Sequence, residues 1–467
     1  MRARFAVSGA ILLAALSSSC LAGPNYKRPA LVEPTVYRGV ASERAVTPDV
    51  SSFGDQKWWE VFQDDALQAL IRSALEQNYD VRIAAARILE ARALVGIARA
   101  DQLPEVNGSV STFNERSPES VGRPAVETSP AQVSISAAWE LDFWGKFRRG
   151  TESARAALIS EEWAQRQIVS SLVSDIASAY FQLREHDLEL EISRQTLTSR
   201  RDSLRLTQVL ADGGATSLLD VRQAEQLVYG ASATIPDLES RIEQQENFIS
   251  ILVGRNPDSI ARGRPLIDQQ QPPEVPAGLP SALLERRPDI LQAEQQLVAA
   301  NAQIGVAKAD YFPQITLTAI GGYQSAALSR LFTGPAGLWT VGAGALQPVF
   351  NGGRIRNNVR FTEARAEEAT LVYQRTVQQA FRDVSDALVS YRKSREVRIE
   401  QQQLTTAAED ATRLSNMRYR GGAASYLEVL DSETRFFDAQ LALAQAQLRE
   451  LQSLVQIYRA LGGGWQQ

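Results

Sequence analysis

Val95–Val106 reads VGIARADQLPEV, and Ile304–Ile315, much farther along the chain, reads IGVAKADYFPQI. A second pair of stretches matches in the same way, because Gly213–Val221 reads GGATSLLDV and Gly421–Val429 reads GGAASYLEV. Both pairs recur at nearly the same offset, which indicates that one long unit was copied whole. Length alone would favour about three domains, but the duplication predicts two intertwined halves of one body.

Charge and the rarer residues exclude several classes of function. Lys and Arg total 49 against 54 Asp and Glu, so the basic face that binds a nucleic acid is not expected. One histidine and one cysteine leave no convincing nucleophile–base pair or metal cluster. The histidine, His186, stands among charged residues and is expected to be solvated. The sequence therefore predicts no enzyme, no catalytic residue and no metal site.

The N-terminus has the pattern of an export signal. Two arginines precede the short apolar run Phe5–Leu16, and small residues then lead to Cys20, the only cysteine. A small-residue run that ends in Cys resembles a bacterial lipoprotein signal, although Ser17 stands where such signals usually have Leu. The resemblance implies that Cys20 carries N-palmitoyl and S-diacylglycerol groups and that the protein travels to the outer membrane. The alternative is ordinary signal cleavage near Ala22.

Long proline-free stretches predict helices. Residues 64–100 carry apolar side chains at helical spacing, and Pro104 ends the pattern. A much longer helix is expected over residues 146–211, where apolar residues recur every seven positions as in a coiled-coil seam. The seam consists of Val169, Ile176, Leu183, Leu190, Leu197 and Leu204.

A tight turn at Gly213-Gly214 is expected to send the chain back along a second helix, residues 218–252. Pro236 lies inside that stretch and should kink the helix or lie near a break, because proline cannot donate a helical hydrogen bond. The second half repeats this order. Its helices are expected at residues 289–309, 354–420 and 426–461.

Between the first helix and the long helix of each half, the period of the sequence changes to two. Strands are expected at about residues 106–114, 132–141, 314–323 and 338–346, with apolar and polar side chains on opposite faces. Strands of about nine residues with aromatic residues at one end are typical of outer-membrane barrels. Four strands cannot close a barrel, so two or three chains would have to share one.

The domain organisation follows from these patterns. We expect a signal peptide at residues 1–19, an extended arm at 20–63, repeat 1 at 64–256 with its hairpin turn at 212–217, a proline-rich linker at 257–288, and repeat 2 at 289–464 with its turn at 420–425.

Four stretches give this chain a family resemblance: Gly23–Pro29 (GPNYKRP), the Trp58-Trp59 pair shortly before Asp64-Asp65-Ala66-Leu67, Glu285–Asp289 (ERRPD) and Ile304–Pro313. Together they resemble signatures of the TolC/OprM family of outer-membrane efflux channels, in its lipidated OprM-like branch. The resemblance implies a mixed α/β membrane protein: a homotrimer with a 12-stranded β-barrel, four strands from each chain, continued by a coiled-coil α-helical barrel in the periplasm.

The same resemblance implies a function and partners. The protein would be a passive exit duct in a tripartite, RND-type pump for drugs, solvents or other small toxic compounds. A periplasmic adaptor would join it to an inner-membrane transporter that supplies the energy. A periplasmic coiled-coil adaptor or scaffold lipoprotein, and a type I secretion duct, are the alternatives. The exported compound and the cognate pump are not indicated by the sequence.

The hairpin turns are the candidate functional sites. Gly213, Gly214, Gly421 and Gly422 permit left-handed backbone, and the resemblance implies that these turns meet the adaptor. Ser217 with Asp220, and Ser425 with Glu428, each fit a helix capping box, which would be a purely structural role for the acids. The resemblance instead implies a periplasmic gate of Asp431, Glu428 and Tyr419, in which Ala424 replaces an arginine common in the family.

Overall fold

The computed structural model describes residues 21–31, 34, 37, 52–119, 121–122, 124–269 and 280–465. The expected signal peptide, Cys20 and much of the expected arm lie outside the described residues. The chain divides into two compact units, which are taken in turn below. The first unit comprises residues 1–30, 87–162 and 292–374, and the second comprises residues 31–86, 163–291 and 375–467.

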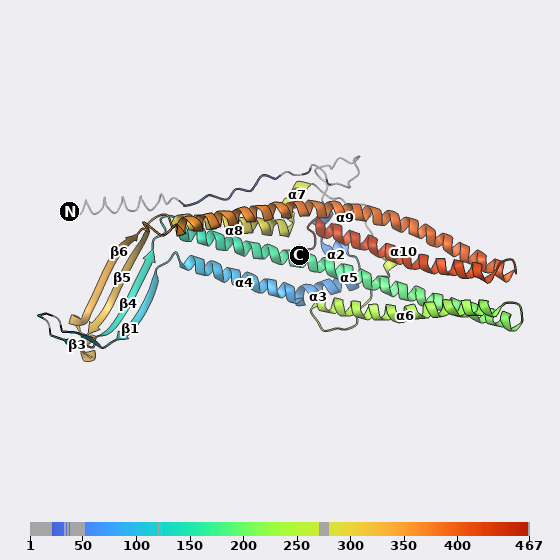
Figure 1. Cartoon of the computed structure of the whole chain (residues 1–467), viewed down its shortest axis with the longest axis horizontal. Helices are drawn as coiled ribbons and strands as arrows, with labels where there is room; N and C mark the ends of the chain where they lie inside the picture. Colours follow the sequence, from blue (N-terminus) through green and yellow to red (C-terminus); the bar gives the residue numbers. More distant parts are fainter. Residues whose placement is uncertain are drawn as a thin grey trace. The chain divides into compact units, whose positions relative to one another are not determined.

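The first unit contains a four-stranded antiparallel sheet to which both halves of the sequence contribute (Figure 1). The order is β1 (Glu105–Thr112), β4 (Ala131–Glu140), β5 (Gln314–Ser325) and β6 (Gly337–Leu346). These bounds lie within two residues of the expected strands. The central pair, β4 with β5, joins one half of the sequence to the other.

The loop between β1 and β4 and the loop between β5 and β6 contain short elements that the sequence did not predict. The loop between β1 and β4 forms a hairpin of β2 (Glu115–Ser117) and β3 (Val126–Thr128), where an irregular segment was expected. The loop between β5 and β6 contains two short 3-10 helices, η3 (Leu328–Arg330) and η4 (Gly334–Ala336).

The strand register places apolar side chains on one face of the whole sheet. Residues paired across antiparallel strands share a face. The chain of pairs Ala137↔Ala319↔Val341 therefore defines one face, and Ser136↔Ile320↔Thr340 the other. Side chains on the first face are Val106, Val110, Val133, Ile135, Ala137, Trp139, Ile315, Leu317, Ala319, Tyr323, Trp339, Val341, Ala343 and Ala345. The opposite face is mostly Ser, Thr, Asn and Gln.

No described segment of the chain covers this apolar face. Val110 is 81% exposed, Trp339 78% and Val341 73%, although such side chains are normally buried. The sheet also has two edges, β1 and β6, whose outer sides pair with no other strand in the described part of the chain. An uncovered apolar face and two open edges indicate a sheet that is completed by other molecules.

The described start of the arm, Leu21–Leu31, is pinned to the first unit. The amide of Ala22 donates to the Trp144 carbonyl at 2.9 Å, and Arg149 donates from Nε to the Ala22 carbonyl at 3.2 Å. Farther on, Arg28 binds Glu294 of α8 (Pro288–Ala309) through two hydrogen bonds of 2.6 and 2.7 Å. Two-pronged charge-assisted bonds of this kind fix orientation as well as position.

Four long helices make two hairpins: α5 (Lys146–Asp212) with α6 (Leu218–Val253), and α9 (Arg354–Arg420) with α10 (Tyr426–Ala460). The predicted seam on α5 is buried at Val169, Ile176, Leu183 and Leu197 and half-buried at Leu190 and Leu204. Helix α6 runs through Pro236 without a break. No helix in the described part of the chain is both long and apolar enough to cross a membrane.

The first predicted helix, residues 64–100, is interrupted. The structure has α3 (Asp65–Gln77) and α4 (Tyr79–Ala100), separated at Asn78, whose backbone ψ of 133° is not helical. The Asn78 side chain accepts hydrogen bonds from the amides of Asp80 and Val81 and so begins a new helix. Periodicity could not predict this break, because asparagine caps helices but also occurs inside them.

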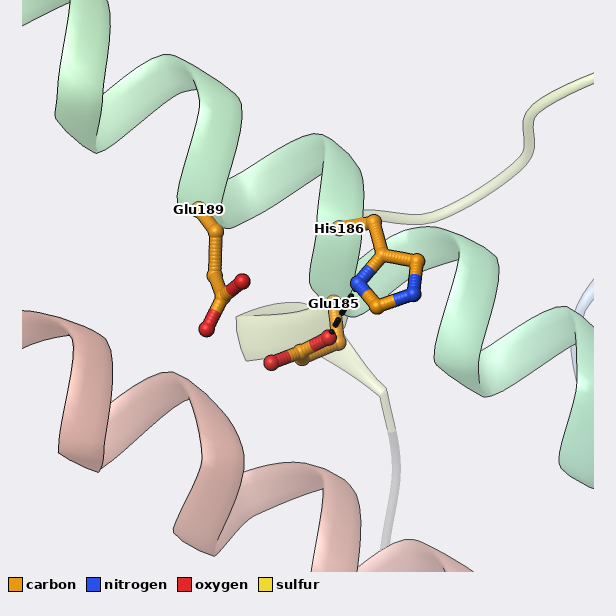
Figure 2. Close-up of side chains that lie close together, drawn as sticks. All are labelled: Glu185, His186 and Glu189. Atoms are coloured by element: carbon orange, nitrogen blue, oxygen red, sulfur yellow. Dashed lines mark ion pairs between the residues drawn. The ribbon is translucent and has the colours of Figure 1, made fainter. Parts of the chain in front are cut away.

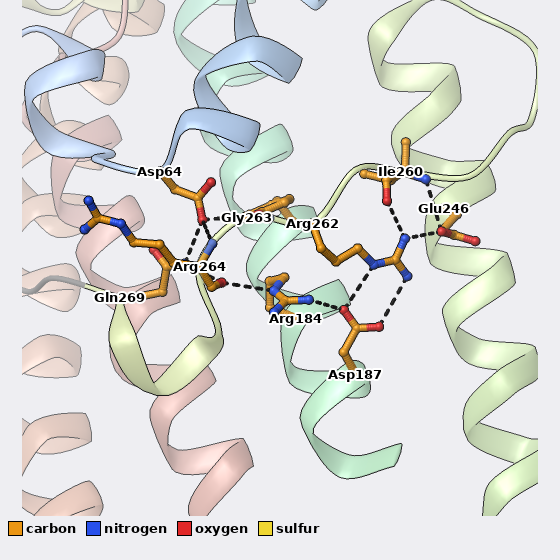
Figure 3. A network of polar contacts seen from close by, with 10 residues as sticks. Asp64, Arg184, Asp187, Glu246, Ile260, Arg262, Gly263, Arg264 and Gln269 are labelled. Carbon is orange, nitrogen blue, oxygen red and sulfur yellow. Dashed lines mark hydrogen bonds and ion pairs between the residues drawn. The ribbon is translucent and has the colours of Figure 1, made fainter. Parts of the chain in front are cut away.

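The described parts of the predicted linker and arm contain short helices that the sequence did not predict. The linker contains η2 (Leu266–Asp268) and α7 (Pro280–Arg286), and two short helical segments, η1 (Phe53–Asp55) and α2 (Trp58–Val61), lie in the predicted arm. A polar network centred on Asp64 fixes the linker (Figure 3). Asp64 is fully buried and accepts from the Tyr180 hydroxyl at 3.1 Å and the Arg264 amide at 2.8 Å.

Arg262 holds the next part of this network. Its guanidinium forms two 3.2 Å hydrogen bonds to Asp187 of α5 and an ion pair with Glu246 of α6 (Figure 3). The neighbouring residue must be glycine, because a Cβ at position 263 would lie 2.1 Å from Oδ1 of Asp64. The linker thus ties α3, α5 and α6 together at the base of the first hairpin.

Candidate functional site at the hairpin turns

The two hairpins end in turns of the same geometry. In the first, the amide of Ala215 donates to the Leu210 carbonyl at 2.8 Å, and Gly214 has a φ of +73°. This is the hydrogen bond of a Schellman C-cap, in which a left-handed glycine ends the helix. Gly213, in contrast, has no positive φ, so only the second glycine of the pair is conformationally required.

The second turn repeats each of these features. Ala423 donates to the Arg418 carbonyl at 2.9 Å, Gly422 has a φ of +72°, and Gly421 again has no positive φ. At both left-handed glycines, no described residue beyond the adjacent ones has an atom within 4 Å of the position that a Cβ would occupy. The turns are therefore geometrically equivalent, and their outer surfaces are open within the chain.

Asp220 caps the returning helix of the first hairpin, as its sequence context predicts. The Ser217 side chain accepts from the Asp220 amide at 3.3 Å, and Asp220 accepts from the Ser217 amide at 3.0 Å. Hydrogen bonds from the Thr216 side chain and then from Ser217 hold the pKa of Asp220 below its usual value. The carboxylate of Asp220 is thus used within its own turn.

Glu428 occupies the matching position in the second hairpin but forms no capping box, which corrects the prediction from sequence. The Ser425 side chain makes no cap hydrogen bond, and Glu428 instead lies 3.6 Å from Nη2 of Arg418. The first half has Leu210 at the position of Arg418, so no cation draws Asp220 away from its cap. Glu428 is therefore exposed and free of a structural cap, near the outer end of the hairpin.

Asp431 lies one turn farther along α10 and is exposed. Its carboxylate accepts from Nε of Arg435 at 2.9 Å, four residues along the same helix. Both partners are more than half exposed, so this ion pair is worth at most a few tenths of a kcal/mol, about 0.3–0.5. Such a weak pair leaves the Asp431 charge available to groups from other molecules.

Tyr419 packs into the contact between the two hairpins. Its ring lies 5.3 Å from that of Tyr426, and its hydroxyl is buried without a hydrogen-bond partner among the described residues. The buried Tyr426 reaches Ser203 of α5, with 3.3 Å between the two hydroxyl oxygens. Around them is an apolar cluster from α5, α6 and α10: Leu204, Ala224, Leu227, Tyr426, Val429 and Leu430, with Tyr419 at its side.

The structure adds two residues that the sequence did not single out. Arg200 of α5 lies over the Phe437 ring at 5.0 Å and donates to the Leu227 carbonyl at 3.0 Å, so it joins three helices. Burial lowers the pKa of Arg200. Burial also raises the pKa of nearby Glu433 on α10, although a hydrogen bond from Asn416 and the charge of Arg200 act against this. In the sequence, both residues look like ordinary surface charges of a long helix.

Comparison with known proteins decides the family. A family model described as "Outer membrane efflux protein" matches residues 70–255 and again residues 279–463, once in each half of the duplication. The chain belongs to the outer membrane efflux protein family. The predicted resemblance is thereby confirmed, and so is the prediction that the protein is not an enzyme.

Individual relatives of the family cover nearly the whole chain. The solvent efflux pump outer membrane protein SrpC of Pseudomonas putida is 36% identical over 96% of this chain and 96% of its own length. The antibiotic efflux pump outer membrane protein ArpC of Pseudomonas putida is also 36% identical, over 96% of this chain and 93% of its own. The solved outer-membrane channel OprN is 31% identical, with a TM-score of 0.89 over 96% of this chain and 100% of that one.

Proposed function

We propose that three copies of this chain form the outer-membrane exit duct of a tripartite efflux pump. The observation that carries this proposal is the uncovered apolar face on a sheet with two open edges. In hydrocarbon, each unpaired backbone group costs several kcal/mol, so the edges must pair with strands of other copies. Three copies supply twelve strands, an even number within the range of bacterial barrels.

The rest of the assembly follows from the duct. A periplasmic adaptor joins the helical hairpins to an inner-membrane RND-type transporter, which supplies the energy, and the duct itself is passive. The exported compounds are small toxic molecules, of which organic solvents and antibiotics are our first candidates because relatives carry those names. The match to the outer membrane efflux protein family covers both halves of the chain and argues against the alternative that this chain is itself a periplasmic adaptor.

A deletion strain tests the proposed function. Loss of the gene should lower tolerance to at least one class in a panel of dyes, detergents, solvents and antibiotics, and the wild-type gene should restore it. When the cells are fractionated, the protein should be found in the outer-membrane fraction. A deletion strain with unchanged tolerance to the whole panel, together with a water-soluble protein, would contradict the proposal.

The gate belongs to the same proposal. Three copies of Asp431 and Glu428 ring the narrow periplasmic mouth, and Tyr419 holds the hairpins in the closed arrangement. Support comes from the exposed, weakly paired carboxylates and from the packing of Tyr419 in the contact between hairpins. A ring of acids attracts cations, as in the filters of cation channels.

Single-channel recording tests the gate. Asp431→Ala should raise conductance in planar bilayers and weaken cation selectivity, because it removes charge and bulk from the aperture. Asp410→Ala is the matched control, since Asp410 is equally exposed and pairs with Arg413 on its own helix. Equal conductance for the wild type and both variants would refute the gate.

Lipidation of Cys20 is also part of the proposal. Ala22, two residues after Cys20 in the sequence, donates its backbone amide to the Trp144 carbonyl. The Trp144 ring stacks on Phe312, with 4.6 Å between the ring centroids, beside the ends of β4 and β5. Residues 21 and 22, which follow Cys20 in the sequence, therefore lie near the strand ends, where a membrane interface is expected. Mass spectrometry of the mature N-terminus should find a triacylated Cys20, and an unmodified terminus at residue 23 would contradict it.

A further inference from the structure

Three side chains of ligand type meet on α5, well before the hairpin turn. Glu185, His186 and Glu189 each offer one donor atom, and these three atoms lie within 4.8 Å of one another (Figure 2). The exposed fractions of the two carboxylate side chains are small, 3% for Glu185 and 5% for Glu189, and that of His186 is 12%. The prediction that His186 is solvated is therefore wrong, because its helix face packs inward.

The negative charge of this group is not compensated by a basic side chain. In the described part of the chain, no lysine or arginine nitrogen lies within 4.0 Å of the Glu185 or Glu189 carboxylate. In the described part of the chain, the Glu185 carboxylate is contacted from inside the group, by Nδ1 of His186 at 2.8 Å and by the neighbouring Glu189 carboxylate. It lies between the other two side chains (Figure 2). A buried carboxylate without a compensating partner is costly, so something else should neutralise it.

Among the described residues, one side chain outside the group hydrogen-bonds to the Glu189 carboxylate. Its Oε1 accepts a hydrogen bond from Nε2 of Gln445 on α10 at 3.0 Å. Gln445 thus connects the group to α10.

We propose that Glu185, His186 and Glu189 bind one divalent transition-metal ion of the Zn²⁺ class, independently of the duct function. An imidazole nitrogen with two carboxylate oxygens suits Zn²⁺, whereas Mg²⁺ and Ca²⁺ prefer oxygen ligands alone. The three ligands leave a fourth position for water. Gln445 acts as an outer partner that orients Glu189 and links the site to α10. The bound ion would neutralise both buried acids and brace α5 against α10.

Metal binding to the full-length detergent-purified protein tests this proposal. The affinity tag must contain no histidine, so that His186 is the only imidazole. Equilibrium dialysis against Zn²⁺ at about pH 7.5, read by elemental mass spectrometry, should give one ion per chain in the presence of excess Mg²⁺. His186→Gln and Glu189→Gln should each weaken binding at least about tenfold. Glu191→Gln, an exposed acid on the same helix, is the matched control and should bind as the wild type does.

A second readout uses the wild-type protein alone. Substitution with Co²⁺ should give a visible absorption spectrum of tetrahedral type, and X-ray absorption should find a single imidazole among the ligands. A wild-type protein that shows no saturable Zn²⁺ binding would overturn the proposal. Binding that survives both the His186 and the Glu189 substitutions would also overturn it. An octahedral Co²⁺ site without a nitrogen ligand would overturn it even if the variants failed to fold.

Discussion

At the scale of single residues, one buried carboxylate does most to define the junction of linker and helices. Asp64 accepts from the amides of Ala66 and Leu67 at the start of α3, and also from Gln269 in the linker. Burial alone would raise its pKa, but hydrogen bonds from Gln269, Leu67, Arg264 and Tyr180 together lower it. The charged form of Asp64 is therefore the form that the fold stabilises.

Asp64→Asn should destabilise the protein by about 2–4 kcal/mol at neutral pH, because an amide replaces an ionised acceptor of several hydrogen bonds. A carboxylate with a lowered pKa contributes stability above its usual pKa, and loses it as pH falls through the folded-state pKa. The difference from the wild type should accordingly shrink below about pH 4. Heat-inactivation temperatures of the purified protein at several pH values measure this.

The control for this prediction is Asp65→Asn, since Asp65 is exposed and next to Asp64 in sequence. It should change the inactivation temperature little at any pH. A difference between wild type and Asp64→Asn that stays constant down to pH 3 would show that the Asp64 charge is not the stabilising feature.

Two variants of Gly214 distinguish the effect of backbone strain from the effect of lost contact with a partner protein. Gly214→Ala places a Cβ at a φ of +73° and should cost about 1–2 kcal/mol in the stability of the turn, whereas Gly213→Ala should cost much less. Gly214→Trp has the same strain and adds bulk to an open surface. If the adaptor contacts this turn, as we propose, only the Trp variant should abolish efflux while the protein still inserts into the membrane.

Hydrogen exchange at residues 205–222 measures the strain, and drug tolerance of the strains measures the efflux. Efflux that survives Gly214→Trp and the matching Gly422→Trp would exclude the turns as the docking surface. Equal exchange rates in the two alanine variants would mean that the left-handed glycine does not control the turn.

At the scale of elements, the sequence predicts the helices and strands that have a periodic side-chain pattern. It does not predict the features that depend on single contacts. Period-two alternation correctly assigns which side chains of the sheet share a face, since the pleat enforces it. The seven-residue seam likewise predicts the long hairpins. The break at Asn78 was missed because it depends on local cap hydrogen bonds that leave no periodic signal. Helix α7 was missed because its seven residues are too few to show a helical period. The linker network was missed because Asp64 and Arg264 are distant in sequence.

The candidate site shows the same division. The turn glycines and the cap at Asp220 follow from local sequence, because all their partners lie within a few residues. Glu428 was assigned a cap that it does not make, and its carboxylate lies toward Arg418 across the turn instead, a contact that the local pattern does not predict. Tyr426 and Arg200 act between hairpins, and contacts between hairpins cannot be derived from the pattern of either one.

The two faces of the sheet give an element-scale prediction with an internal control. Ile135 lies on the apolar face and Ser136, the next residue, lies on the polar face. Ile135→Lys should cost about 2–4 kcal/mol if that face meets lipid, whereas Ser136→Lys should be tolerated. The amount of heat-modifiable protein in the outer-membrane fraction reports the difference. Equal loss in the two variants, or greater loss with Ser136→Lys, would contradict the assignment of faces.

At the scale of the whole molecule, duplication supplies two strands and one hairpin from each half, and the sheet uses both halves through the pair of β4 with β5. Among the described strands, the sheet of one chain still has two open edges, β1 and β6. How many copies close the sheet depends on the stagger between neighbouring chains, which a single sequence does not encode in any local pattern. The number three therefore comes from the family resemblance and not from a local pattern of this chain.

Native mass spectrometry of the protein extracted from the outer membrane in detergent counts the chains in one complex. We expect a complex of three chains that survives mild detergent and separates on heating. A water-soluble monomer, or a membrane complex of two or four chains, would contradict it.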